Sequence, residues 1–347
     1  MSVLSNIPLN IEEPAPHAEV ATGSAVCAFD VHATPALLLK ILREAFASED
    51  ESVFFFKRSK ADFNSPSSAF ERRIGSLFGA SNLSPKLFSA LLKEAFFSLA
   101  KSNIDGFESE NFGFCEIGAE PELNLFENSK VLRLGDAIGL SGNLFVFSNE
   151  LLDAQPFDRF YFGGGEVLKQ YCRFSENGKV ELFFREAPDF EKEFLRGYFG
   201  GLDGGFILDF SFEALDLLKK ICRQNWKGVL IFADYFRAKE ELLSFERGTA
   251  RSYFRHAASS DIFSNIGECD ITFSPAVEPL LDILKGEGFS FAECSAQGSF
   301  FMKNSQNEIR RVVETGGVFS PEKRALAELL TPQHMGESFK ILSAARF

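Results

Sequence analysis

Apolar residues recur at helical spacing near the start of the chain and as short runs in the remainder. Residues 36–46 and 86–101 carry apolar side chains every three or four positions, and each segment follows a Thr-Pro or Ser-Pro pair, a typical helix start. Residues 1–33 mix Pro, Glu, Ala and Ser without a period, so we expect a poorly ordered lead-in. The pattern predicts a helical N-terminal part over residues 34–110.

From residue 111 onward, short apolar runs alternate with helical or loop segments, which is typical of a mainly parallel sheet with covered faces. The predicted strands are 112–117, 131–134, 144–147, 228–233, 288–293 and 339–342, and the predicted helices are 211–224, 275–285 and 321–330. Within 158–184, Phe- and Tyr-rich runs are broken by a triple glycine and by Asn177-Gly178, a typical hairpin turn. We therefore predict an α/β domain over 111–347 with an antiparallel insertion at about 158–205.

The predicted strand 144–147 ends abruptly in a Ser-Asn-Glu sequence, and a helix-like segment follows it. In α/β sheets, functional side chains gather at the carboxyl ends of the strands. Asn149, Glu150 and Asp153 are therefore candidates for chemistry. In the alternative interpretation, Ser148 or Asn149 caps the following helix, and Glu150 lies in its first turn, where the helix dipole favours an acid.

A second polar pair, Asp234 and Tyr235, follows the most regular predicted strand, 228–233. At a strand end, Asp234 could face the same cleft as the first cluster. Alternatively, its carboxylate accepts hydrogen bonds from loop N–H groups and fixes the turn. The sequence favours neither interpretation.

Charge and cysteine content restrict the possible partners. The net charge of -13 opposes binding to a phosphate backbone. Six cysteines are scattered without a CxxC pair, and the four histidines lie far from any two of them, so the spacing predicts reduced thiols and no metal site. No uncharged run approaches the roughly 18 residues of a membrane span, and no signal-peptide pattern is present. We expect a cytoplasmic protein with neither a nucleic-acid partner nor a membrane span.

Short motifs occur along the chain in a characteristic order. They are Ala61–Pro66, Phe114–Gly118, Ser148–Pro156, Asp234-Tyr235, Gly248–Tyr253 with His256, Gly267–Thr272, Gln297–Phe300 and Met335–Lys340. From about residue 53 to the end, this set resembles the MidA family of class I S-adenosylmethionine-dependent methyltransferases, a group that includes the mitochondrial complex I assembly arginine methyltransferase. The resemblance implies a Rossmann-like sheet, S-adenosylmethionine as cofactor, and a protein as substrate or assembly partner.

The resemblance also implies roles for individual residues. On the acceptor and catalytic side they are Asn149, Glu150, Asp153, Asp234 and His256. On the cofactor side they are Asp62, Ser65, Glu116 and Gly118. Read without the resemblance, His256 is more often a structural histidine, Asp62 and Ser65 form an ordinary Asx turn, and Gln297-Gly298 forms a turn after a strand.

The cofactor motif departs from the family pattern. The family has Glu-x-Gly-x-Gly-x-Gly, because glycine lets the backbone approach the cofactor closely, whereas residues 116–122 read EIGAEPE and keep one of those glycines. The interval from Glu116 to Asn149 is only 33 positions, which is short for the strand and helices that relatives place there. Two functions follow: a methyltransferase acting on a protein side chain such as arginine, which we favour, or a catalytically silent member that serves as a binding or assembly module.

Overall fold

The computed structural model describes residues 85–118, 125–127, 129–132, 138–174, 180–201, 205–254, 257–263, 269–315, 317 and 320–347. These residues divide into two compact units. The described residues of the large unit fall in Lys60–Asp153, Ala214–Arg237 and Val277–Phe347, and those of the small unit fall in Ala154–Glu213 and Ala238–Ala276. The lead-in expected at 1–33 and the helix expected at 36–46 lie outside the described residues.

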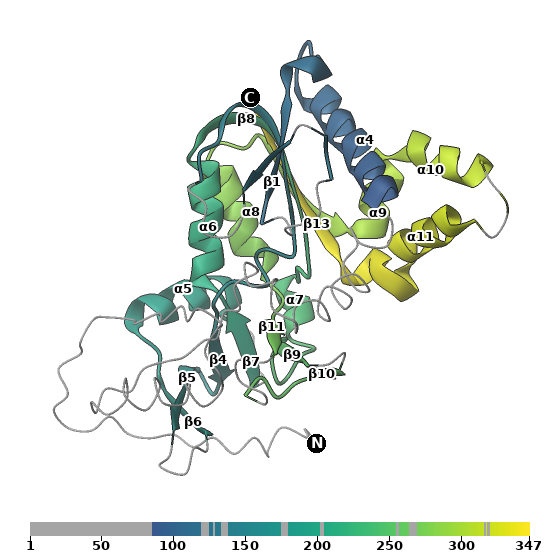
Figure 1. The fold of residues 1–347 in the computed structure, drawn as a ribbon. Coiled ribbons are helices and arrows are strands. Elements are labelled where there is room, and N and C mark those ends of the chain that lie inside the picture. Colours follow the sequence, from purple (N-terminus) through teal and green to yellow (C-terminus); the bar gives the residue numbers. More distant parts are fainter. Residues whose placement is uncertain are drawn as a thin grey trace. The chain divides into compact units, whose positions relative to one another are not determined.

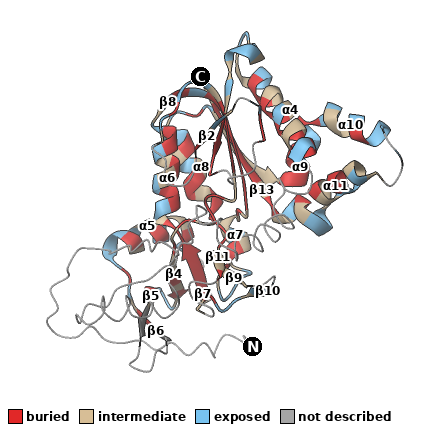
Figure 2. Cartoon of the chain, in the orientation of Figure 1, coloured by how far each residue is buried: buried red, intermediate tan, exposed pale blue. Residues whose placement is uncertain are grey.

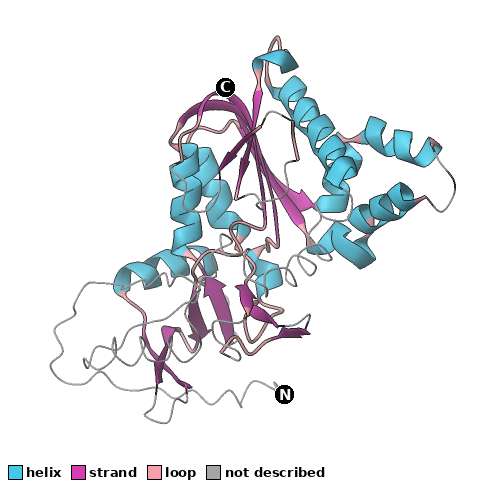
Figure 3. Cartoon of the chain, in the orientation of Figure 1, coloured by secondary structure: helices cyan, strands magenta, loops and turns pink. Residues whose placement is uncertain are grey.

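The large unit contains a six-stranded mixed sheet with the order β12-β13-β8-β3-β1-β2 (Figures 1 and 3). Its strands are β1 (Gly113–Ile117), β2 (Lys130–Leu132), β3 (Ser141–Asn149), β8 (Asn225–Asp234), β12 (Phe291–Ala296) and β13 (Lys340–Arg346). The neighbouring strands β2, β1, β3 and β8 are parallel, whereas β13 runs antiparallel to both β8 and β12. The predicted α/β fold is thus confirmed, and each predicted strand is present with shifted ends.

Helices cover both faces of this sheet. On one face lie α4 (Pro85–Asn103), α9 (Gln297–Asn304), α10 (Gln306–Glu314) and α11 (Pro321–Leu330), and on the other lie α6 (Phe212–Cys222) and α8 (Val277–Gly286) (Figure 1). Short turns of helix, η3 (Ser109–Asn111) and η4 (Pro332–Gly336), complete the described elements of this unit. The helix predicted at 86–101 is α4, and Pro85 occupies its first position, where a missing N–H costs no hydrogen bond.

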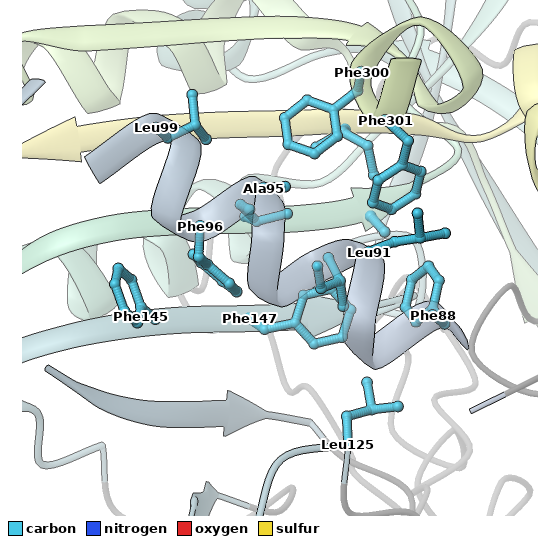
Figure 4. Close-up of a cluster of buried hydrophobic side chains, with 14 of the residues drawn as sticks. Phe88, Leu91, Ala95, Phe96, Leu99, Leu125, Phe145, Phe147, Phe300 and Phe301 are labelled. Atoms are coloured by element: carbon cyan, nitrogen blue, oxygen red, sulfur yellow. The ribbon is translucent and has the colours of Figure 1, made fainter. Parts of the chain in front are cut away.

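Phenylalanine builds the core between α4 and the sheet. Figure 2 shows the buried side of α4 turned toward the strands, and Figure 4 shows the side chains that fill the space between them. The rings of Phe96 and Phe145 lie 5.1 Å apart, and Phe114 stacks on Phe126 at 4.3 Å. Phe has no polar ring atom, so this core needs no buried hydrogen-bond partner for its aromatic side chains.

The small unit consists largely of antiparallel strands. A four-stranded sheet has the order β6-β5-β4-β7, and a three-stranded sheet has the order β10-β9-β11. The strands are β4 (Asp158–Gly163), β5 (Glu166–Phe174), β6 (Val180–Glu186), β7 (Phe206–Phe210), β9 (Arg251–Phe254), β10 (Ala257–Ser259) and β11 (Asp270–Thr272), and the helices are α5 (Asp189–Phe199) and α7 (Lys239–Leu242). The expected antiparallel sheet is confirmed, and Gly164 and Gly165, both with positive φ, form its first hairpin turn.

A buried ion cluster joins β4, β5 and α5. The Lys169 ammonium lies 2.8 Å from both the Asp158 and the Glu191 carboxylates, and all three side chains are largely shielded from water. Burial raises the pKa of Asp158 and of Glu191, and Lys169 opposes that rise. Burial alone would lower the pKa of Lys169, but the two carboxylates together raise it. One cation therefore holds two acids in a poorly hydrated environment.

Candidate functional site

The carboxyl ends of three parallel strands bring the candidate residues of the large unit to one edge of the sheet. Glu116 lies near the end of β1 and pairs in register with Phe147, while Asn149 ends β3 and pairs with Ala233, next to Asp234. The strand order reverses at β1, which lies between β2 and β3. In open α/β sheets, ligands bind at such a switch point, outside the carboxyl ends of the strands.

Asp234 holds the loop that follows β3. Its Oδ2 accepts hydrogen bonds from the backbone N–H groups of Leu152, at 2.9 Å, and Asp153, at 3.2 Å. Its Oδ1 accepts the N–H of Tyr235 at 2.8 Å, and the side chain is buried. These contacts support the interpretation in which Asp234 fixes a turn, and they place Asp153 beside it.

The prediction of a helix directly after residue 149 is wrong. Residues 150–153 form a bend and a turn instead, so neither Ser148 nor Asn149 caps a helix there. The Glu150 N–H continues the β-ladder by donating to the Ala233 carbonyl. The N–H groups of Leu152 and Asp153 donate to the Asp234 carboxylate instead of to helical carbonyl groups. A contact between residues 82 positions apart thus overrides the local helical signal.

Glu150 has a left-handed backbone conformation, with φ of 48°. It is the one non-glycine residue with positive φ in the described part of the chain. Such a conformation costs roughly 1–3 kcal/mol and typically persists at functional sites that surrounding structure holds in place. The Asn149 amide donates to Glu150 Oε1 at 3.3 Å, so the two polar side chains lie together at the strand end.

Gly118 begins the turn after β1 and also has a positive φ, of 73°. Its N–H donates to the Leu132 carbonyl at 2.7 Å, and a Cβ at this position would lie 2.8 Å from Leu151 Cδ1. Glycine is therefore required by backbone conformation and by space. Glu116 is buried, and its Oε2 accepts a long hydrogen bond, 3.4 Å, from the Leu125 N–H.

Three of the expected site residues, Asp62, Ser65 and His256, lie outside the described residues, as do positions 119–122 of the cofactor motif. The structure brings together Glu116 and Gly118 at the end of β1, and Asn149, Glu150, Asp153 and Asp234 at the ends of β3 and β8. The described residues contain no group of three or more His, Cys, Asp or Glu side chains suited to a metal ion. No helix among them has the length and apolar character to cross a membrane.

Sequence reasoning missed Asp209, a buried acid in β7 of the small unit. Its carboxylate accepts hydrogen bonds from Arg159 Nε at 2.7 Å and from the Ala250 N–H at 2.6 Å. A Cβ on Gly248 would lie 2.4 Å from Asp209 Oδ2, so this motif glycine allows the segment to approach the acid. An acid inside the apolar run 206–210 was the available signal, because a buried charge needs partners.

The motif at Gln297-Gly298 is not the turn expected after β12, since it begins helix α9. The Gln297 N–H donates to the Phe339 carbonyl, and its side-chain amide donates to the Leu329 carbonyl at 3.1 Å. A Cβ on either Gly298 or Gly336 would lie 2.3 Å from the Leu330 carbonyl oxygen. These two motifs therefore serve close backbone packing around the end of α11.

The mixed sheet, with its antiparallel β13 beside β8, has the fold of class I methyltransferases, as two solved structures from Burkholderia thailandensis show. One, whose description reads "likely methyl transferase" and "bound to S-adenosyl-homocysteine", aligns with a TM-score of 0.64 and 20% identity over 77% of this chain and 78% of that chain. The other, described as an uncharacterized protein of the same superfamily, aligns with a TM-score of 0.69 and 19% identity over 90% of this chain and 92% of that chain.

Residues 131–293 match the family model described as "Putative S-adenosyl-L-methionine-dependent methyltransferase". This segment is similar to that family, in line with the resemblance that the sequence motifs indicate, and S-adenosylmethionine is the cofactor that the family description names. A comparison with curated proteins found no match.

Proposed function

We propose that this chain is an S-adenosylmethionine-dependent methyltransferase that transfers a methyl group to a nitrogen of a protein side chain, with arginine as the expected acceptor. The observation that carries the proposal is Glu150. Its strained backbone conformation, the Asn149 amide beside it and the Asp234 hydrogen bonds that hold the loop fix a carboxylate at the carboxyl edge of the sheet. A structure that only caps a turn would not need the strain.

The described residues fit a cofactor at the end of β1. Gly118 leaves no side chain above the turn, and it lies at the switch point between β1 and β3, where dinucleotide-like ligands bind in open α/β sheets. The resemblance assigns Glu116 and Gly118 to this role, with Asp62 and Ser65. When bound, S-adenosylmethionine supplies a methyl group on a positively charged sulfur.

The protein's own contribution to the reaction is to bind the methyl donor and the acceptor and to align them. Methyl transfer to nitrogen is an in-line displacement, so rate depends on holding donor and acceptor close, aligned and dry. Glu150 and Asp153 offer carboxylates that can orient a guanidinium through paired, charge-assisted hydrogen bonds, and the Asn149 amide holds Glu150 in place. Asp234 acts through this loop and is a positioning residue.

Calorimetric titration with S-adenosylhomocysteine tests the proposal. The folded protein is expected to bind the ligand with 1:1 stoichiometry, and Glu150→Gln is expected to bind it with the same affinity because Glu150 serves the acceptor. Glu314→Gln, an exposed position at the end of α10, is the matched control. Absence of heat at millimolar ligand, from protein with a cooperative melting transition, contradicts the proposal.

A second candidate function is a silent member of the family that binds or assembles partners. Its support is the sequence Ala119–Glu122, where two acids replace glycines and would oppose a carboxylate-bearing cofactor. The same titration separates the two functions, because the silent module predicts no binding of S-adenosylhomocysteine while the fold stays intact.

A further inference from the structure

We propose that Leu151 is a positioning residue that couples the turn at Gly118 to the loop carrying Glu150 and Asp153, so that cofactor binding orders the acceptor loop. The inference rests on the proposed function, since it requires a cofactor at Gly118. It implies that the two substrates bind in order: the cofactor binds first and orders the loop, and the acceptor binds second.

The first observation is the contact between Leu151 and Gly118. A Cβ built on Gly118 would lie 2.8 Å from Leu151 Cδ1, 3.6 Å from its Cγ and 3.7 Å from its Cβ. The leucine side chain therefore rests directly against the glycine backbone, and it is buried there. Because packed interiors contain few voids, a shift of the Gly118 turn must move Leu151 or be resisted by it.

The second observation is a hydrogen bond that joins the same two strand ends. Ser148 Oγ, which is buried, donates to the Ile117 carbonyl at 2.8 Å. Ile117 precedes Gly118, and Ser148 lies three positions before Leu151, so β1 and the loop after β3 are fixed at two successive points. Burial makes this bond costly to break, since the carbonyl would lose its partner.

The third observation concerns two backbone hydrogen bonds of the loop, whose amide exchange rates would change when the cofactor binds. The N–H groups of Leu152 and Asp153, directly after Leu151, donate to Asp234 Oδ2. These amide protons exchange with solvent only when the loop leaves Asp234. A ligand that stabilises the Gly118 turn also stabilises the packing of Leu151 on Gly118. The population of the loop conformation that is hydrogen-bonded to Asp234 then rises by the same coupling free energy.

Hydrogen–deuterium exchange of the peptide covering residues 148–157 tests the coupling, with S-adenosylhomocysteine as the probe. In the native protein, saturating ligand is expected to slow exchange at residues 152 and 153 by about fivefold or more, the lower end of typical site-to-site couplings. Leu151→Ala is expected to bind ligand and to lose most of this protection. Ser148→Ala is expected to lose part of it, and Leu151→Met to keep it.

Leu326→Ala is the matched control, because Leu326 is an equally buried leucine on α11, in the core under the other helices. It is expected to lower the melting temperature and to keep the ligand-induced protection. Ligand binding without protection in the native protein overturns the coupling and leaves the proposed function intact. Full protection in ligand-saturated Leu151→Ala overturns it as well. Absence of ligand binding overturns the proposed function.

A second-site experiment tests the same contact without exchange data. Gly118→Ala is expected to weaken S-adenosylhomocysteine binding, because the new methyl group meets Leu151. Gly118→Ala combined with Leu151→Ala is expected to bind more tightly than Gly118→Ala alone, since the second change vacates the space. The positive φ of residue 118 limits the rescue to a partial one. Strictly additive losses of affinity would overturn the proposal.

Discussion

At the scale of single residues, the site contains a strained backbone conformation at Glu150 and hydrogen bonds from the following loop to Asp234 that stabilise it. Glu150 adopts a backbone conformation that favours glycine, and Asp234 supplies the hydrogen bonds that hold the loop after it. The polar character of both positions was readable from the sequence, because each follows an apolar run of strand length. The left-handed conformation was not readable, since it depends on a carboxylate that lies 84 positions away along the chain.

We predict that Glu150→Gly stabilises the protein by about 1 kcal/mol and abolishes methyl transfer. Glycine removes the steric cost of positive φ, while its loss of chain entropy offsets part of the gain. The free energy of unfolding in urea is the measurement. Glu150→Ala keeps the strain and is the control. If alanine stabilises as much as glycine, the effect comes from removing the charge and the strain argument fails.

At the scale of elements, buried contacts between helices and strands explain motifs that look functional in the sequence. Gly298 and Gly336 serve the packing of α9 and η4 on α11, and Gly248 makes room for Asp209. The helices α9 and α10 could not be predicted from an apolar period. The two large rings of α9 are adjacent, at Phe300 and Phe301, and α10 buries only Val312.

We predict that Gly298→Ala destabilises the large unit by about 1–3 kcal/mol, because the added methyl group would lie 2.3 Å from the Leu330 carbonyl oxygen. φ at Gly298 is not positive, so the effect would be steric. Gly286→Ala, where a Cβ meets nothing within 4 Å, is the control. Chemical denaturation of both variants gives the comparison, and equal stability of the two would contradict the packing argument.

The ion cluster of the small unit predicts how the stability cost of a substitution changes with pH. Lys169→Met is expected to cost about 3–5 kcal/mol at neutral pH, because it leaves Asp158 and Glu191 buried without a cation. Burial raises the pKa of both acids, so the folded state takes up their protons above the ordinary carboxylate range. The cost of the substitution is therefore expected to shrink as the pH falls through that raised range.

Unfolding free energies of native protein and Lys169→Met at two pH values, near 8 and near 5, measure this effect. Lys192→Met is the control, because Lys192 pairs with the exposed acids Glu186 and Asp189, and it is expected to change stability little. A cost for Lys169→Met that stays constant or grows at the lower pH would show that the two acids do not carry charge in the buried cluster.

At the scale of the whole molecule, the order of short apolar runs predicted the α/β fold, and the solved structures confirm it. The position of Asn149, Glu150 and Asp234 at strand ends could be predicted, because each follows an apolar run. The contacts of Leu151 and Ser148 with the end of β1 could not be predicted, because they join segments that are distant along the chain. The domain boundaries, the roles of the site residues and the cytoplasmic location stay predictions.

We propose that this chain moves a methyl group from S-adenosylmethionine to a protein nitrogen. The most direct measurement incubates the folded protein with methyl-labelled S-adenosylmethionine and arginine-containing peptides, followed by hydrolysis and separation of methylated amino acids. We expect label in methylarginine with native protein and with Glu314→Gln, and about 100-fold less with Glu150→Gln, since a misplaced acceptor costs that much in rate. Equal labelling by Glu150→Gln, or bound cofactor with no labelled amino acid, would contradict it.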